Sequence, residues 1–193
     1  MSSDNCLLIT DNCIMIIAQE KRKTNLAEYI LYMWQVEDIL RAYKFDIEAV
    51  DKNIISQFKQ DEEKHQEIRA WYENLIEMMK IEKVEERGHL QILKNNVNEL
   101  FDFHMHLLNN KKDAAYIGLF EKAAGNINEF RQKSQAKEEN NDIEVCLTAL
   151  YGILMLKLQQ KEISKETIAA VTTFSQLISD LTAKYKAFEE EKE

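Results

Sequence analysis

Apolar residues recur at helical spacing along almost the whole chain. The clearest series begins at Ile68, where apolar positions fall at i, i+3, i+4, i+7, i+8 and i+11. This spacing places the apolar side chains on one face of an α-helix. Further helices are predicted in the ranges 24–43, 46–58, 90–108, 116–130, 143–158 and 168–188. The pattern therefore predicts an all-α protein with no sheet.

Two of these stretches are apolar around most of the helix circumference. Residues 24–43 and 143–158 both have this character, and the second is apolar at twelve of its sixteen positions. Such helices typically lie at the centre of a domain. We therefore expect a single-domain bundle of about six helices, centred on these two, with Trp34 and Tyr151 in its core.

The composition excludes several classes of site. The chain has no proline and four glycines, and no two glycines are closer than seven residues. Glycine-rich loops that bind phosphates or dinucleotides, and the nucleophile elbow of serine hydrolases, cannot be written from this sequence. The apolar stretch 143–158 is shorter than the roughly twenty residues of a membrane span and contains Glu144 and Lys157. We expect no membrane partner.

The charge and the cysteines indicate the environment of the chain. The formal net charge is −9, which disfavours binding to nucleic acid and to anionic lipid. The cysteines are Cys6, Cys13 and Cys146, an odd number without a C-x-x-C pair. This pattern does not indicate a disulfide framework and favours a reducing, cytoplasmic location.

The first residues lack the helical pattern. No Lys or Arg precedes Lys21, and polar residues at 10–12 split the early apolar positions, so we do not expect a secretory signal. From Met15 the pattern becomes regular. We expect residues 1–14 to be an unstructured extension and residues 15–193 to be one helical domain. Whether Met15 is the natural start stays open.

Two pairs have the spacing of carboxylate-bridged metal sites. They are Glu62-x-x-His65 and Glu86-x-x-His89, and each pair would share one face of a helix. His65 falls in a wholly polar stretch, however, and Gly88 interrupts the second pair. His104 and His106 would diverge by about 200° on a helix and cannot hold one ion. We expect no metal and no cofactor.

A polar strip crosses the otherwise apolar helix 24–43. Glu28, Tyr32 and Gln35 lie on one face at spacings of four and three, and His104 falls on the apolar stripe of another helix. Buried polar groups need partners. The strip is either exposed, an internal network, or the lining of a core pocket that includes His104. Glu37 and Arg41 are interpreted as an ordinary i, i+4 pair.

Several words of the sequence are distinctive when taken together. They are MIIAQEKRKTN, AEYILYMWQVEDILRA, WYENLIEMM, ERGHLQ and EVCLTALYGILMLKLQQKEIS, beginning at Met15. In combination they resemble an uncharacterised bacterial family of all-helical domains of unknown function, over residues 15–188. Members of that family begin at the position of Met15. The resemblance implies a single cytosolic helical domain and assigns no catalytic or binding residue.

Two functions follow as hypotheses. No nucleophile–base pair can be proposed, so we name no catalytic residue and favour a non-enzymatic interaction module that forms a homo-oligomer, such as a dimer, or binds a protein partner. The reason is that the outer helices carry more large apolar side chains than we expect them to bury within one domain. These side chains are Trp71, Tyr72, Phe174, Tyr185 and Phe188. The alternative is a small-molecule-binding or enzymatic bundle with a pocket near Glu28, Tyr32, Gln35 and His104.

Overall fold

The computed structural model describes residues 14–58, 61–134 and 140–191. Of these residues 82% are helical, in eight α-helices, and none is in a strand. The all-α prediction is confirmed, although the helix count of about six was too low. The helices are α1 (Ile14–Thr24), α2 (Leu26–Ala42), α3 (Ile47–Asn53), α4 (Glu62–Ile81), α5 (Gln91–Asn110), α6 (Ala114–Lys133), α7 (Asp142–Leu158) and α8 (Lys165–Glu190), with a 3-10 turn η1 (Ile55–Gln57).

Side-chain caps begin most of these helices at residues that suit the role. Asp46 accepts hydrogen bonds from the backbone of α3, and Ser164 accepts one from Thr167 N at 3.2 Å. At α2 the carboxamide of Asn25 accepts from Glu28 N at 3.1 Å, and Glu28 Oε1 accepts from the same carboxamide at 3.3 Å. Asn25 therefore caps α2, and Glu28 holds the capping side chain through its carboxamide.

The chain divides into two compact units. Of the described residues, unit 1 contains those up to Lys23 and those from Tyr32 to Gln91, and unit 2 contains those from Thr24 to Leu31 and those from Ile92 onward. Helix α2 therefore contributes its first turns to unit 2 and the remainder to unit 1. The expected boundary at residue 15 and the single domain beyond it stay predictions, and residues 1–13 lie outside the described ranges.

Helices α3 and α4 and the turn η1 pack against one another in unit 1, and α2 also contributes buried side chains to this unit. The apolar stripe predicted from Ile68 faces the core of unit 1, and Tyr72 and Met79 on it are fully buried. Trp34 contributes from α2 and is 3% exposed, as expected. The connection 82–90 after α4 contains Gly88 at φ +89, a conformation that side-chain-bearing residues rarely adopt. The break expected at Gly88 is therefore confirmed.

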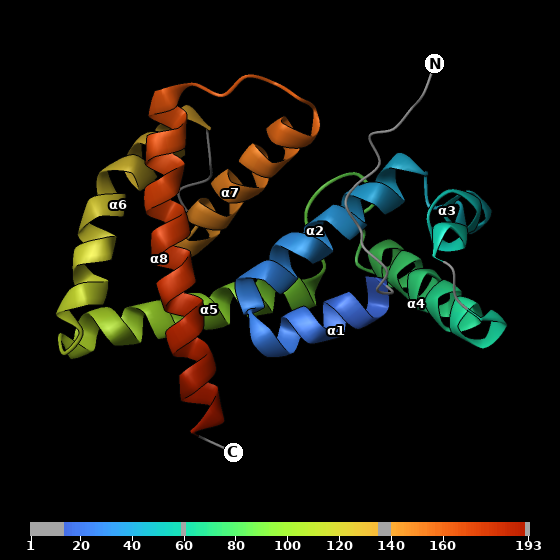
Figure 1. The fold of residues 1–193 in the computed structure, drawn as a ribbon, viewed down its shortest axis with the longest axis horizontal. Helices are drawn as coiled ribbons and strands as arrows, with labels where there is room; N and C mark the ends of the chain where they lie inside the picture. The colour runs from blue at the N-terminus through green and yellow to red at the C-terminus, as the bar shows by residue number, and fades with distance from the viewer. Residues whose placement is uncertain (1–13, 59–60, 135–139, 192–193) are drawn as a thin grey trace. The chain divides into compact units, whose positions relative to one another are not determined.

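Unit 2 is built around three neighbouring helices. Helices α6 and α8 lie side by side and run antiparallel, and α7 packs against α8 (Figure 1). The core of unit 2 contains the fully buried side chains of α5, α6, α7 and α8. Among these are Leu93, Leu100, Tyr116, Ile127, Ile143, Cys146, Leu147, Phe174 and Leu181.

Two expectations about burial need correction. Helix α7 is buried only over its first half, and Tyr151 is half-buried rather than a core residue. Because α7 is apolar along its whole length, its sequence does not indicate which half lies at the surface. Conversely, Tyr72 and Phe174, counted as apolar surplus of outer helices, are buried within their own units. An amphipathic stripe in a small unit is largely used to build that unit's core.

None of the helices in the described ranges is long and apolar enough to cross a membrane.

Candidate functional site

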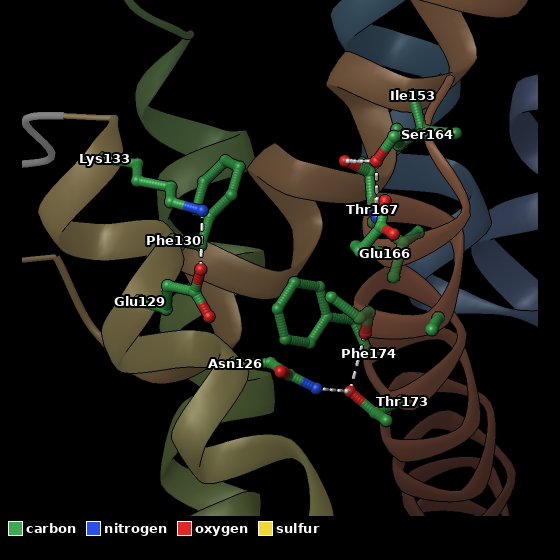
Figure 2. A pocket seen from close by; sticks show the side chains of 13 residues that line it. Asn126, Glu129, Phe130, Lys133, Ile153, Ser164, Glu166, Thr167, Thr173 and Phe174 are labelled. Carbon is green, nitrogen blue, oxygen red and sulfur yellow. Dashed lines mark hydrogen bonds and ion pairs between the residues drawn. The ribbon is translucent and has the colours of Figure 1, made fainter.

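A cleft of about 590 Å³ opens between α6, α7 and α8 in unit 2 (Figure 2). Helix α6 forms one wall, the first turns of α8 form the other, and α7 contributes Ile153. The lining residues are Asn126, Glu129, Phe130, Lys133, Ile153, Ser164, Glu166, Thr167, Ala169, Ala170, Val171, Thr173 and Phe174. All of them belong to unit 2, so the cleft is complete within one compact unit.

The inner part of the cleft is aromatic. The rings of Phe130 and Phe174 approach edge to face, with centroids 6.4 Å apart and an interplanar angle of 79°. Beside them Asn126 Nδ2 donates to Thr173 Oγ1 at 3.1 Å and joins α6 to α8 (Figure 2). The walls are thus tied together at this end, where the surface offered to a ligand is largely apolar.

The mouth of the cleft is polar and each of its charges is already engaged. Lys133 Nζ donates to Glu129 Oε1 at 2.5 Å on α6. On the opposite wall Ser164 caps α8, and its hydroxyl together with the backbone N–H of Glu166 holds the pKa of that carboxyl below its usual value. The mouth therefore offers hydrogen-bonding groups and no free cation for an anionic ligand.

The four residues predicted for a core pocket do not line this cleft. Glu28 is exposed and hydrogen-bonds the capping side chain of Asn25, and it lies in unit 2 with His104. Tyr32 and Gln35 are half-buried and lie in unit 1. A pocket formed by the four together stays a prediction.

His104 is a fully buried residue of the unit 2 core. Its Nδ1 lies 2.6 Å from the hydroxyl of Tyr116, which is also fully buried, and the ring of Phe120 packs against it at 4.9 Å. Burial holds the pKa of His104 below its usual value, and the charge of Asp142 opposes this only in part. Burial also raises the pKa of Tyr116 and of Cys146. The cluster is therefore neutral, as suits a structural contact.

We expect His104 to make unit 2 sensitive to acid. Above about pH 6.5 the imidazole is neutral in both the native and unfolded chains, so it adds no pH dependence. Below that pH the unfolded chain takes up a proton that native His104 resists, and stability falls by at most about 1.4 kcal/mol per pH unit. Urea unfolding of the parent and of His104→Gln across this range tests it. The stability difference between them should shrink on acidification, and a constant difference would contradict the assignment.

A second cluster of polar side chains lies in unit 1. The carboxylate of Glu37 is 1% exposed, and its Oε1 accepts from Leu90 N at 2.8 Å. Its Oε2 lies 2.5 Å from His89 Nδ1 and 4.0 Å from Arg41 Nη2. The ring of His89 stacks on Trp34 with centroids 4.3 Å apart. One buried carboxylate thus fixes both the backbone and the imidazole at the end of the connection 82–90.

Arg41 holds the other part of the same connection. Its Nη2 donates to the carbonyls of Val84, at 3.0 Å, and Gly88, while Nη1 donates to Asp38 at 2.8 Å. The i, i+4 contact of Glu37 and Arg41 expected from the sequence is present, at 4.0 Å. Both side chains also contact residues more than forty positions away, which the spacing on one helix could not show.

The chain matches one known protein family over most of its length. The family model described as "Domain of unknown function (DUF4924)" matches residues 15–192. The chain belongs to this family. The match runs through both compact units and confirms the resemblance inferred from the sequence. No curated protein and no solved structure matches the chain significantly.

The DUF4924 description names no activity, so only the geometry of the structure indicates where a functional site lies. The signal for Glu37 was present in the sequence, since it lies three to four residues from Met33, Trp34 and Leu40 on the apolar side of α2. A carboxylate at such a position must find donors. The sequence contains no comparable indication of the cleft. Its lining residues come from three helices, and within each helix they look like ordinary surface residues.

The histidine pairs with metal-site spacing have other partners in this DUF4924 chain. His65 Nε2 lies 2.9 Å from Asp51, which also pairs with Arg69 at 2.6 Å, and these contacts lower the pKa of Asp51 against the effect of burial. His89 contacts Glu37 rather than Glu86. Within the described ranges, no three His, Cys, Asp or Glu residues are grouped as metal ligands would be.

Proposed function

We propose that this chain is a non-enzymatic binding module of the bacterial cytosol, whose unit 2 cleft holds a small, mainly apolar, uncharged ligand. The observation that carries the proposal is the cleft itself, with Phe130 and Phe174 at its inner end. Its volume of about 590 Å³ falls within the range typical of small-molecule sites, which are mostly apolar with a few polar groups.

The charges support an uncharged ligand. Lys133 is paired with Glu129, and the N-terminus of α8 is already capped by Ser164 and faced by Glu166. The net charge of −9 adds a general repulsion of anions. The hydroxyl of Thr167 at the mouth and the carboxamide of Asn126 beside the inner rings suit a ligand that carries neutral polar groups.

Self-association is the second candidate, and one observation favours it. Leu158 and Ile168 are exposed at the end of α7 and in the first turn of α8. A second copy could cover this face through a two-fold contact. We rank it second because Tyr72 and Phe174, which motivated it from the sequence, are used inside their own units.

The ligand hypothesis is tested with N-phenyl-1-naphthylamine, a neutral aromatic probe that fluoresces in apolar sites. We expect saturable binding to the full chain that Ala170→Phe weakens at least tenfold, because Ala170 is a half-buried lining residue and the new ring would fill the cleft. Ala183→Phe, an exposed position on the same helix outside the cleft, is the matched control and should bind as the parent does.

The same titration separates the two candidates. A ligand site gives one affinity at all protein concentrations, whereas a cleft covered by a second copy loses probe binding as the protein concentration rises. Equal probe binding by the parent and Ala170→Phe would contradict the proposal.

A further inference from the structure

His89 in unit 1 is held by contacts on one edge and one face of its ring. The Nδ1 edge faces the buried carboxylate of Glu37 at 2.5 Å, and one ring face stacks on Trp34 with an interplanar angle of 16°. The side chain is nevertheless 32% exposed. Neither contact covers the opposite edge of the ring, which carries Nε2, or the other ring face.

The carboxylate determines which nitrogen can react. A carboxylate accepts hydrogen bonds, so Nδ1 carries the hydrogen and Nε2 of the neutral ring carries the lone pair. Glu37 is itself fixed by Leu90 N at 2.8 Å, so the ring is oriented by a group that does not move with solvent. A carboxylate behind an imidazole fixes the tautomer and the orientation of the ring.

We propose that His89 is a covalent modification site for small, uncharged electrophiles with an activated carbonyl group. The Nε2 lone pair attacks the carbonyl carbon, and an N–C bond forms. The bond from that carbon to its leaving group breaks, and the leaving group departs with the bonding electrons. The hydrogen on Nδ1 then passes to Glu37, which leaves a neutral acyl-imidazole. No oxidant or metal is needed for this step.

The other three histidines lack this combination. His104 is fully buried. His65 uses its Nε2 in the contact with Asp51, at 2.9 Å. His106 is exposed and lies near the rings of Phe103 and Phe188, and the described residues place no carboxylate in hydrogen-bonding contact with it. Only His89 therefore combines access with an orienting carboxylate.

Electrostatics select an uncharged electrophile over a phosphoryl donor. Glu37 and Asp38 lie close to the site, and the guanidinium of Arg41 is committed to Asp38 and to the carbonyls of Val84 and Gly88. Among the charged groups that contact His89 or its partners, the carboxylates of Glu37 and Asp38 would repel a phosphate group, and the guanidinium of Arg41 is already engaged.

Diethyl pyrocarbonate, an uncharged activated carbonyl, is the probe for this site. The full chain is treated well above the usual imidazole pKa of about 6.5, and the adducts are located by peptide mass mapping over time. We expect His89 to react about tenfold faster than His106, which serves as the internal reference, with His65 and His104 slower still. A rate for His89 no higher than that for His106 would overturn the proposal.

Two variants separate orientation from exposure. Glu37→Gln should bring the rate of His89 down to that of His106, while Glu86→Gln, an exposed acid three residues from His89, should leave it unchanged. Fluorescence of Trp34 in a Trp71→Phe background reports whether the stacking survives in Glu37→Gln. An unchanged or faster His89 in Glu37→Gln with Trp34 still buried would contradict the role of the carboxylate. If the stacking is lost, the comparison of His89 with His106 in the parent decides alone.

Discussion

Replacing Trp34 by alanine is expected to cost about 3–5 kcal/mol of unfolding free energy, which would leave unit 1 marginal or unfolded. The indole is 3% exposed and stacks on His89, so its removal opens a cavity and also frees the imidazole. Truncation of a buried aromatic side chain costs this much in well-packed cores. Against a total stability of about 5–15 kcal/mol, few single changes would have a larger effect. Urea unfolding followed by circular dichroism measures it.

Trp71 provides the control for Trp34, because it is the other tryptophan of the chain and is half-buried. Trp71→Ala should cost clearly less than Trp34→Ala. In Trp71→Phe the remaining fluorescence comes from Trp34 and should be poorly quenched by iodide. Free quenching, or a Trp34→Ala variant that unfolds like the parent, would show that Trp34 is not a core residue.

Phe174→Ala is expected to have a comparable effect in unit 2, again about 3–5 kcal/mol. This side chain is 1% exposed, forms the inner end of the cleft and contacts Phe130 edge to face. Its loss would both reduce the apolar core and open the floor of the cleft to water. The same unfolding measurement applies, and probe binding should fall with it.

Tyr151→Ala is the comparison for Phe174→Ala. Tyr151 lies in the most apolar helix of the chain but is half-buried, so its truncation should cost less than that of Phe174. If Tyr151→Ala proved the more damaging of the two, the second half of α7 would be covered in solution, which is the arrangement that self-association requires.

The sequence could predict the helices because their signals are local. The apolar repeat from Ile68 and the caps at Asp46 and Ser164 depend only on neighbouring residues, and the structure has all three. Burial of α7 was predicted less well, because a helix that is apolar all round carries no information about which part lies at the surface. That depends on the lengths and directions of its neighbours.

The site was harder to predict because its determinants are far apart in the sequence. Asn126 and Thr173 meet across the cleft although forty-seven positions separate them, and either could equally be a solvated polar residue. The four predicted pocket residues were chosen for their spacing within single helices. That criterion finds faces of helices, whereas a cleft is defined by the divergence of two helices that the sequence does not specify.

Arg41 has a consequence for how substitutions in this family should be interpreted. Its planar guanidinium donates a hydrogen bond to Asp38 from one terminal nitrogen and hydrogen bonds to the carbonyls of Val84 and Gly88 from the other. Lysine keeps the positive charge but concentrates it in one ammonium group, without the rigid fork that reaches separate acceptors. An exchange between these two cations at position 41 would preserve the charge of the chain and still release the connection that carries His89. Charge-conserving replacements are therefore not neutral here.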